Sequence, residues 1–501
     1  MKRYFSVIQI IAIATVAALA LSSCDKGKKT NVEVLPVMDK ALNQPSSVWY
    51  ADFDVFPQNM DRSQLPIGVF DSGTGGLTVL EVILGADYLD NIEGDAGPDG
   101  IPDFHGEDFQ YLADQANMPY GTYSSEGKAD YLRELAVKDA LFLLGDKYYK
   151  LPTDKSAKGT KSRCKILVIA CNTATAYGLN DIKNLLDLSG TGVRVIGVIN
   201  AGVNAAFEDI ASSKERDSLS IGVMATIGTI DSDAYRRTIE EVKKARNYPG
   251  FVQVVNQKGA GFAEAVDLEK DYVDLSLTAP RDSYRGPSLG EGEDDIKEEL
   301  LPVYNFCFKD GGVLYKKENG KYTQFQLNSA ANYARFHLVS LLEKVRQSKE
   351  QAPLKSVILG CTHYPFLLDT LKQTLKELKE FKKNGMYIYS HLIADDFTFI
   401  DPAVFTAIEC CKALREDKLM ALRTRRGNVD AYISVPYYRV DPKYLEKDGG
   451  LTREFKYGRF PGTEDITTVP VPFSKENLNP DNLKRIQKLV PYTYEKIKEK
   501  L

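Results

Sequence analysis

The chain has 501 residues, of which 43% are hydrophobic and 27% are charged. At about 150 residues per domain this length predicts two to four domains, and the composition excludes a disordered protein. The 64 basic and 69 acidic residues give a formal charge of -5, so there is no electrostatic basis for a nucleic-acid partner. Seven cysteines are too few for a disulfide scaffold. We expect a compact globular protein of enzyme size.

The N-terminus has the pattern of a secretion signal. Lys2 and Arg3 precede an almost wholly apolar run over residues 4–21, and two serines then lead to Cys24. This pattern resembles a bacterial lipoprotein signal, which implies cleavage before Cys24 and acylation of its thiol. The alternative is an uncleaved membrane anchor. We therefore expect residues 1–23 to be a signal peptide and the protein to be lipid-anchored in the cell envelope, as a periplasmic or outer-membrane lipoprotein.

Residues 24–62 are expected to form a tether and an N-terminal arm. From residue 63 onward, short apolar runs alternate with segments of helical periodicity, which predicts parallel sheets joined by right-handed crossovers. The expected strands cover residues 67–70, 110–113, 165–170, 194–199, 220–224, 251–255 and 356–359. The expected helices cover residues 77–84, 128–144, 173–186, 203–212, 233–246, 330–347 and 364–381.

A weak internal repeat indicates two related lobes. The segment that starts at Ile67 is echoed by the one that starts at Ile221, and Ile169-Ala-Cys-Asn-Thr is echoed by Leu359-Gly-Cys-Thr-His. Each echo puts polar residues just past a strand, where open α/β sheets bind ligands. The predicted fold class is α/β, with two pseudo-symmetric, doubly wound parallel-sheet lobes and the active site in the cleft between them. The expected domains are lobe 1 (63–192 plus 383–420), lobe 2 (193–382) and a C-terminal extension (421–501).

Two stretches are expected to be loops. Residues 90–108 are acidic and rich in turn formers, and Pro98-Asp-Gly-Ile-Pro-Asp103 resembles calcium loops, because Ca²⁺ takes several oxygen ligands around a glycine turn. Asp99 and Asp103 are the candidate metal ligands, and a solvated loop is the alternative. Residues 275–299 mix Pro, Gly, Ser and acidic residues, and are expected to be a surface excursion.

A glycine-rich turn follows the first predicted strand. In Asp71-Ser-Gly-Thr-Gly-Gly76 the backbone amides could hold an anion such as a carboxylate. The turn is not a P-loop, because no Gly-Lys-Ser/Thr follows it. The alternative is a tight turn without a ligand. Asp71 could face the cleft or cap the next helix.

Two cysteines each lie between a strand and a helix. Cys171 and Cys361 would both feel a helix N-terminus, which stabilises a thiolate that can act as a base or a nucleophile. The ordinary alternative for each is a buried structural cysteine. His363 lies two residues after Cys361, and on its own it could equally be a structural histidine.

Four segments together resemble the glutamate racemase family of cofactor-independent amino-acid racemases. They are residues 67–79, Met118-Pro-Tyr-Gly121, Ala170-Cys-Asn-Thr-Ala174 and Leu359-Gly-Cys-Thr-His-Tyr-Pro365, and a fifth, Ile221 to Tyr235, fits the family's central segment. The resemblance implies that Cys171 and Cys361 are the two bases, one for each face of Cα, that Asp71 and His363 assist them, and that no cofactor takes part. It also implies substrate contacts, partly through backbone groups, by Asp71, Ser72, Tyr120, Gly121, Asn172, Thr173, Thr362 and His363.

The predicted function is the interconversion of L- and D-glutamate. Near Asp267 the family often has Glu, and Asn200-Ala201 stands where the family commonly has an acid and then Pro, so side-chain selectivity stays open. The alternatives are a two-lobed solute-binding lipoprotein without catalysis and a related isomerase for aspartate or another small dicarboxylate. The expected partners are an amino-acid substrate and, through the lipid, a membrane; a homodimer is allowed.

Overall fold

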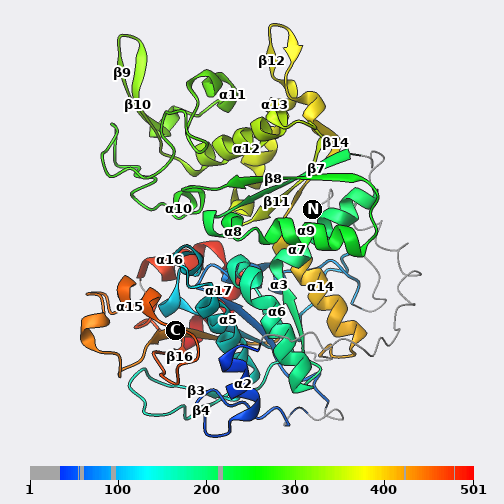
Figure 1. The fold of residues 1–501 in the computed structure, drawn as a ribbon, viewed down its shortest axis with the longest axis vertical. Helices are drawn as coiled ribbons and strands as arrows, with labels where there is room; N and C mark the ends of the chain where they lie inside the picture. Colours follow the sequence, from blue (N-terminus) through cyan, green and yellow to red (C-terminus); the bar gives the residue numbers. More distant parts are fainter. Residues whose placement is uncertain are drawn as a thin grey trace. The chain divides into compact units, whose positions relative to one another are not determined.

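The chain forms two α/β units in the computed structural model, one of residues Met1–Ala201 and Ala403–Leu501 and one of residues Gly202–Pro402 (Figure 1). The structure describes residues 34–54, 56, 61–91, 97–212, 218–421, 425–478 and 480–501. The expected signal peptide and Cys24 lie outside these residues. None of the described helices is both long and apolar enough to cross a bilayer.

The first unit is built on a six-stranded sheet in the order β16-β15-β2-β1-β5-β6. Neighbouring strands are parallel except at the edge, where β16 runs antiparallel to β15. β1 and β2 are buried along their whole length, which explains why their sequences are largely apolar instead of alternating. The strands are β1 (Ile67–Asp71), β2 (Phe109–Ala113), β5 (Ile166–Ile169), β6 (Arg194–Gly197), β15 (Val429–Pro436) and β16 (Thr468–Pro472).

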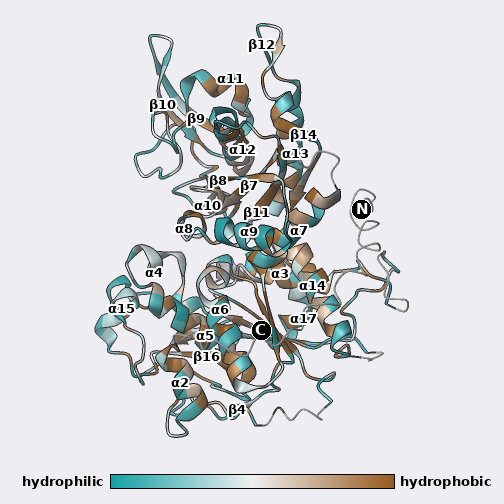
Figure 2. Ribbon diagram, turned by 45° about the vertical axis from the view of Figure 1, so that its right-hand side comes forward, coloured by the Kyte–Doolittle hydropathy of each residue, from teal (hydrophilic) through white to brown (hydrophobic). Residues whose placement is uncertain are grey.

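The second unit is built on a four-stranded parallel sheet in the order β14-β11-β7-β8. Its strands are β7 (Ser218–Ala225), β8 (Phe251–Lys258), β11 (Leu354–Gly360) and β14 (Ile393–Ile400), and its longer helices are α9 (Ala234–Ala245), α12 (Ala330–Gln347) and α13 (Leu368–Glu380). Figure 2 shows α9 as mostly hydrophilic, in agreement with its burial of only three side chains, whereas α12 buries eleven. α12 is therefore the central helix of this unit's core.

The two sheets share one strand topology. In each unit the first strand lies between the second and the third, and the fourth lies beyond the third, giving β2-β1-β5-β6 and β8-β7-β11-β14. Lys165 and Lys355 stand the same number of residues before Cys171 and Cys361, and each lysine is buried in an ion pair. The predicted pseudo-symmetric α/β architecture is confirmed at the level of each unit.

The predicted domain boundaries need three corrections. β6 was expected in lobe 2 but pairs with β5, and β14 was expected in lobe 1 but pairs with β11. The expected C-terminal extension is part of the first unit, because β15 pairs with β2 and β16 with β15. Without them the edge of β2 would expose unpaired backbone groups.

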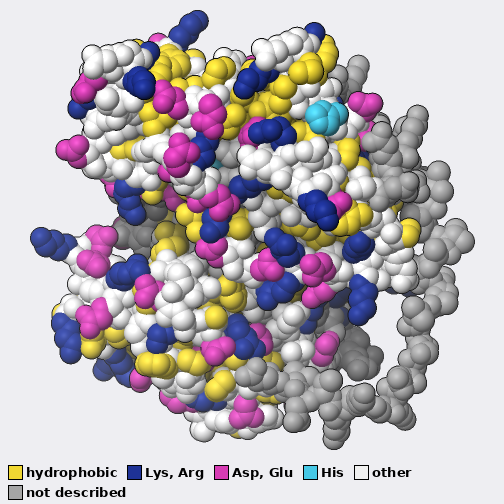
Figure 3. Space-filling view, turned by 45° about the horizontal axis from the view of Figure 1, so that its top comes forward, with side chains coloured by type: hydrophobic (Ala, Val, Ile, Leu, Met, Phe, Trp, Pro, Cys, Tyr) yellow, Lys and Arg dark blue, Asp and Glu magenta, His cyan; other side chains and the backbone are white. Residues whose placement is uncertain are grey.

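The surface carries charges of both signs. On the face shown in Figure 3, Lys and Arg side chains are interspersed with Asp and Glu side chains. This mixture fits the small formal charge of -5. A face of this kind creates no extended field of one sign for steering a charged partner.

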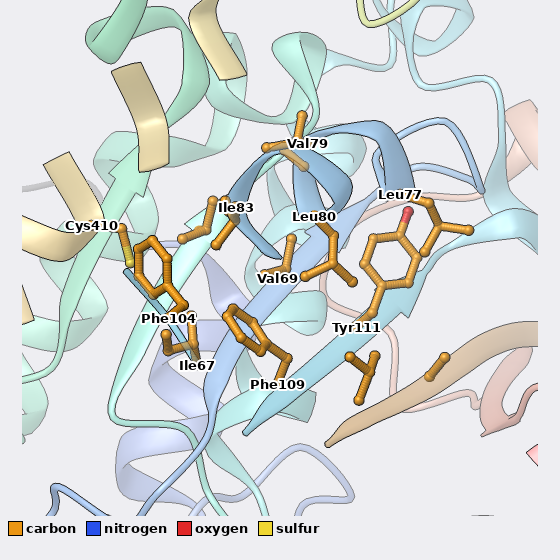
Figure 4. Packing of buried hydrophobic residues seen from close by; sticks show 14 of the residues in the cluster. Ile67, Val69, Leu77, Val79, Leu80, Ile83, Phe104, Phe109, Tyr111 and Cys410 are labelled. Carbon is orange, nitrogen blue, oxygen red and sulfur yellow. The ribbon is translucent and has the colours of Figure 1, made fainter. Parts of the chain in front are cut away.

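Helix α3 (Leu77–Leu84) covers one face of the first sheet, and its bounds match the prediction. Its residues Leu80 and Ile83 pack with Val69 of β1 and Phe109 of β2 (Figure 4). Cys410, from α14 (Pro402–Glu416), joins the same core. Each fully buried aliphatic side chain contributes roughly 1.5–3 kcal/mol, so this layer is a main source of the unit's stability.

The opposite core of the first unit contains α5 (Ala129–Leu144), α6 (Asn172–Ser189) and the N-terminal arm. A Cβ on Gly178 of α6 would lie 2.4 Å from the Cβ of Ala136, so only glycine allows this close approach of the two helices. The arm forms α2 (Pro36–Asn43), whose Val37 and Met38 are fully buried in this core. The expected arm is therefore an ordered part of the unit.

The acidic loop is not simply solvated. Asp103 is 3% exposed and accepts the backbone N–H groups of Tyr88 and Leu89, while Asp99 accepts those of Asn91 and Ile101. Among the described residues, no group of three or more His, Cys, Asp or Glu side chains is arranged to hold a metal ion. The two candidate calcium ligands instead hold the loop closed.

Glu107, at the end of that loop, makes a buried ion pair with Lys165. Their charged atoms are 2.6 Å apart, and the side chains are 1% and 0% exposed. The Lys165 ammonium also donates to the carbonyls of Ser63 and Leu419, while Glu107 accepts the N–H of Ala421. This pair thus ties the chain before β1 to the segment after α14.

Glu107→Gln is predicted to destabilise the first unit by about 3–5 kcal/mol, because it leaves a buried ammonium without its counter-charge. The measurement is the urea midpoint followed by the fluorescence of Trp49, the only tryptophan of the chain. Glu495→Gln, which breaks the exposed pair with Lys498, is the control and should change stability by less than about 0.5 kcal/mol. Equal effects of the two variants would contradict the role given to Glu107.

Candidate active site

Cys171 lies between β5 and α6, at the predicted place. It is the N-cap residue of α6, and its Sγ accepts a hydrogen bond from the N–H of Ala174 at 3.4 Å. The side chain is 7% exposed, and its thiol lies 3.6 Å from the hydroxyl of Ser72. The sulfur is thus nearly buried while it contacts the polar turn after β1.

Asp71 ends β1 and organises that turn. Its Oδ2 accepts the N–H groups of Gly76 at 2.8 Å and Gly73 at 3.3 Å, and its carboxyl group also hydrogen-bonds with Cys171. A Cβ on Gly76 would lie 2.5 Å from the Cβ of Asp71, so the turn requires glycine there. The carboxylate thus binds the backbone at the start of α3 and also contacts the thiol. We call Asp71, Ser72 and Cys171 the Cys171 cluster.

The electrostatic environment of this cluster disfavours the thiolate form of Cys171. Burial, and then the negative charge of Asp71, raise the pKa of Cys171 to about 12, although the Ala174 amide and Ser72 act in the other direction. Burial also raises the pKa of Asp71, while the Gly76 amide lowers it. The N-terminus of α6 does favour the thiolate, through the Ala174 amide, but burial and Asp71 outweigh this effect. At neutral pH this residue is a thiol.

The other residues expected to bind substrate in this unit have different environments. Asn172 and Thr173 form the first turn of α6, next to Cys171, and Gly121 begins the short helix α4 (Gly121–Ser125). The Tyr120 side chain is 1% exposed and its hydroxyl contacts the carboxylates of Asp114 and Asp139. The Tyr120 side chain therefore belongs to the interior, which leaves only its backbone for a substrate.

Tyr111 was missed by the sequence analysis. Its hydroxyl donates a hydrogen bond to the carbonyl of Gly73 at 2.6 Å, which fixes the turn from the neighbouring strand β2. The side chain is fully buried. Nothing in the local sequence signals this role, since an aromatic residue in a buried strand is ordinary core.

Cys361 follows β11 of the second unit and is also 7% exposed. The chain after it forms a short 3₁₀-helix (Tyr364–Leu367) that continues into α13, where the sequence predicted one unbroken helix. Cys361 is thus separated from α13 by a tight turn that contains His363. This turn lets the imidazole fold back toward the sulfur.

His363 connects Cys361 to a carboxylate. Its Nδ1 lies 3.5 Å from the sulfur of Cys361 and 3.4 Å from the hydroxyl of Thr362, and its Nε2 lies 3.2 Å from an oxygen of Asp267. Burial lowers the pKa of His363, but the Cys361 sulfur and Asp267 outweigh it and raise the pKa to about 10. The imidazole is therefore a cation at neutral pH. We call Cys361, His363 and Asp267 the Cys361 cluster.

Aromatic residues surround the Cys361 cluster. Tyr364 is fully buried and stacks on Phe262 with 4.2 Å between ring centroids, and Tyr235 is 2% exposed. Burial, followed by the charge of Cys361, raises the pKa of both phenols. A Cβ on Gly360 would lie 2.9 Å from the Tyr235 ring, which explains the glycine before Cys361. These walls exclude water from the sulfur and strengthen its interaction with the imidazolium.

Each unit therefore contains a nearly buried thiol at the carboxyl end of its third strand, with an ionisable partner of its own. The partner is a carboxylate at Cys171 and an imidazole–carboxylate pair at Cys361. Such groups take up and deliver protons. Sites of this kind fit an isomerase of the α/β class.

Comparisons with known proteins point to one family. The glutamate racemase of Oceanobacillus iheyensis is 28% identical over 318 residues, which cover 64% of this chain and 73% of the relative. That of Clostridium novyi is 25% identical over 75% of this chain and 93% of the relative, and that of Staphylococcus epidermidis is 36% identical over 38% and 56%. No protein-family profile matches the chain.

Solved structures of glutamate racemases are also similar. The enzyme of Bacillus anthracis aligns over 74% of this chain and 88% of its own, with 21% identity and a TM-score of 0.41. The enzyme of Francisella tularensis in complex with D-glutamate aligns over the same shares, with 20% identity and a TM-score of 0.39. Over most of its length, this chain is therefore similar in sequence to glutamate racemases.

Asp71→Asn is predicted to lower the pKa of Cys171 below about 12, because the amide removes the negative charge beside the thiol and can still accept the Gly76 amide. Below the pKa, each unit of decrease raises the thiolate fraction about tenfold. The measurement is the rate of iodoacetamide modification of Cys171 against pH, read by peptide mass spectrometry. Cys164, whose pKa is raised to about 12 by burial without an acidic neighbour, is the internal control and should keep its rate. A Cys171 profile identical to that of the unsubstituted protein would refute the influence of Asp71.

Proposed function

We propose that this chain interconverts L- and D-glutamate without a cofactor, with Cys171 and Cys361 as the two acid–base groups. Racemisation needs one group to remove the Cα proton and a second to deliver a proton to the opposite face. The observation that carries the proposal is the equivalent position of the two thiols in the two units, after β5 and after β11. The similarity to glutamate racemases supports glutamate as the substrate.

The protonation states suggest how the reaction is balanced. One sulfur acts as a thiolate, takes the Cα proton and becomes a thiol, while the other thiol delivers its proton and becomes a thiolate. We assign Cys171, a thiol at neutral pH, as the proton donor in one direction and Cys361, beside His363, as the base, and the reverse direction exchanges these roles. The net reaction consumes no proton, and exchange through Asp71 and His363 restores the starting state.

The carbanion-like transition state requires stabilisation of the α-carboxylate. The first turn of α6 and the turn around Gly73 offer backbone N–H groups beside Cys171, and such groups stabilise developing negative charge when water is excluded. Asn172 and Thr173 are placed to contribute there. Asp71 and His363 position protons at the two sulfurs and are the supporting groups of this mechanism.

Cys171→Ala and Cys361→Ala are each predicted to lower kcat for racemisation by at least about 10²–10⁴-fold, because each removes one proton-transfer group. The measurement is circular dichroism of L- and of D-glutamate during incubation with the full-length protein. Cys307→Ala removes the exposed cysteine and should leave the rate unchanged. Full activity in either of the first two variants would refute the assignment.

Proton exchange separates the proposal from its alternatives. Incubation of L-glutamate in deuterated water should place deuterium at Cα of the D-glutamate product, as read by NMR. A protein that only binds solutes gives no exchange, and exchange with L-aspartate but not with glutamate would assign the activity to the other dicarboxylate. Cys171→Ser should slow the two directions unequally, whereas an equal loss would count against face-specific bases.

The proposal extends to the place of action. The apolar run of residues 4–21 followed by Cys24 supports a lipid-anchored protein of the cell envelope, with the acylated thiol as its first residue after processing. A single acyl chain binds membranes only marginally, so stable anchoring needs the several chains of a lipoprotein modification.

Cys24→Ala is predicted to prevent incorporation of labelled fatty acid and to release the mature chain from the membrane fraction. Membrane fractionation of a bacterial host, with detection of the chain by antibody, is the measurement. Cys307→Ala is again the control, and it should keep both the label and the membrane association. Label retained by the Cys24 variant would refute acylation at this residue.

A further inference from the structure

The first unit contains a cavity of about 420 Å³ whose lining includes none of the residues of the Cys171 cluster. Its walls come from three places in the chain: the N-terminal arm at Val48–Asp52, the region from α5 to Arg163, and the C-terminal segment with Ser434 and Thr468. Cavities of this volume hold small organic ligands. The mechanism proposed above does not involve this cavity.

Two carboxyl groups, those of Asp114 and Asp139, lie among the lining residues. They are 3% and 6% exposed, and the hydroxyl of Tyr120 lies 2.5 Å from an oxygen of Asp114 and 2.7 Å from Oδ2 of Asp139. One hydroxyl proton cannot serve two carboxylates. Asn117 donates to both oxygens of Asp114, but Oδ1 of Asp139 accepts no hydrogen bond from the described residues.

No cation among the described residues forms a direct ion pair with these carboxyl groups, although the charge of Lys138 acts on both from a greater distance. Lys138, which also lines the cavity, pairs with Glu134 at 2.7 Å, and Arg163 pairs with Asp146. Neither Asp114 nor Asp139 has an ion pair within 4.0 Å in the part of the chain that the structure describes. Burial, followed by the charge of Asp114, raises the pKa of Asp139 well above its usual value. A ligand that brings a positive charge acts in the opposite direction and stabilises the carboxylate.

The remaining walls are apolar and aromatic. Trp49, Phe142, Tyr148 and Tyr149 line the cavity, together with aliphatic residues such as Leu135. Aromatic faces bind both flat apolar groups and the cationic end of a ligand. Two of these rings already bind cations, since the ammonium of Lys138 lies 4.2 Å from the ring centroid of Trp49 and that of Lys161 lies 4.6 Å from the ring centroid of Phe142. An anion would be repelled by the carboxyl pair.

From these features we propose that the cavity is a second ligand site, which binds an amphipathic organic amine with an aromatic or apolar body. The ammonium group contacts Oδ1 of Asp139, and the body lies against Trp49 and Phe142. This inference is independent of the proposed racemase activity. It assigns a function to the arm and to the C-terminal segment, both of which build the cavity.

The test uses phenethylamine as the probe and Trp49 as the reporter. Because Trp49 is the only tryptophan of the chain and lines the cavity, selective excitation of tryptophan reports on this site alone. We expect a saturable change of fluorescence when the full-length protein is titrated with phenethylamine at neutral pH. Phenethyl alcohol, which lacks the charge, and hydrocinnamate, which carries the opposite charge, should bind at least about tenfold more weakly.

Asp139→Asn is expected to raise the Kd for phenethylamine about tenfold or more and to leave the Kd for phenethyl alcohol nearly unchanged. Asp130→Asn, on the exposed face of the same helix α5, is the matched control and should bind like the unsubstituted protein. The melting temperature of each variant shows that it is folded. Phe142→Ala should weaken the binding of phenethylamine and of phenethyl alcohol to the same extent, as measured by Trp49 fluorescence. This variant keeps the proposal testable if Asp139→Asn does not fold. No saturable binding of phenethylamine, equal binding of hydrocinnamate, or unchanged affinity in the Asp139 or Phe142 variant would overturn the proposal.

Discussion

The buried carboxylate of Asp71 is the group on which the Cys171 cluster depends. One of its oxygens binds the amides of Gly73 and Gly76, so it fixes the path from β1 into α3, and the same group touches the thiol of Cys171. Burial, and then the negative charge of Asp71, raise the pKa of that sulfur, while in the second unit the residue beside the cysteine is the cationic His363. The two units thus share one strand topology but place charges of opposite sign beside their cysteines.

Local sequence patterns predicted much of the secondary structure. The bounds of α3 and α12 were predicted correctly, because each helix has an apolar pattern of helical period and a clear start. Gly76 precedes α3, and Ser329, whose side chain accepts the N–H of Asn332, precedes α12. The internal repeat also predicted the shared topology, because it marks the first and third strands of each unit. The two cysteines, Asp71 and His363 could be found because each follows an apolar strand, where polar side chains gather in α/β sheets.

Features that depend on distant parts of the chain were missed. The pairing of β15 with β2, and of β14 with β11, decides the domain boundaries, and no local pattern encodes it. The burial of Tyr120 and the high pKa of Cys171 follow from charges and packing that only the folded chain brings together. Two short hairpins did carry a local signal: Asn319-Gly320 and Asn384-Gly385 both adopt positive φ angles, as the tightest hairpin turns demand.

The parallel pairing of β15 with β2 also constrains the order in which the protein can be assembled. The second unit is continuous in sequence, so it can close its sheet as soon as its own residues are available. The first unit cannot, because its strand β2 ends at Ala113 while its neighbour β15 begins only at Val429. At about 5–20 residues per second, a ribosome needs roughly a quarter of a minute to one minute to make the chain between them. Throughout that interval the edge of β2 lacks its neighbouring strand, and an unpaired strand edge is a site at which chains can aggregate.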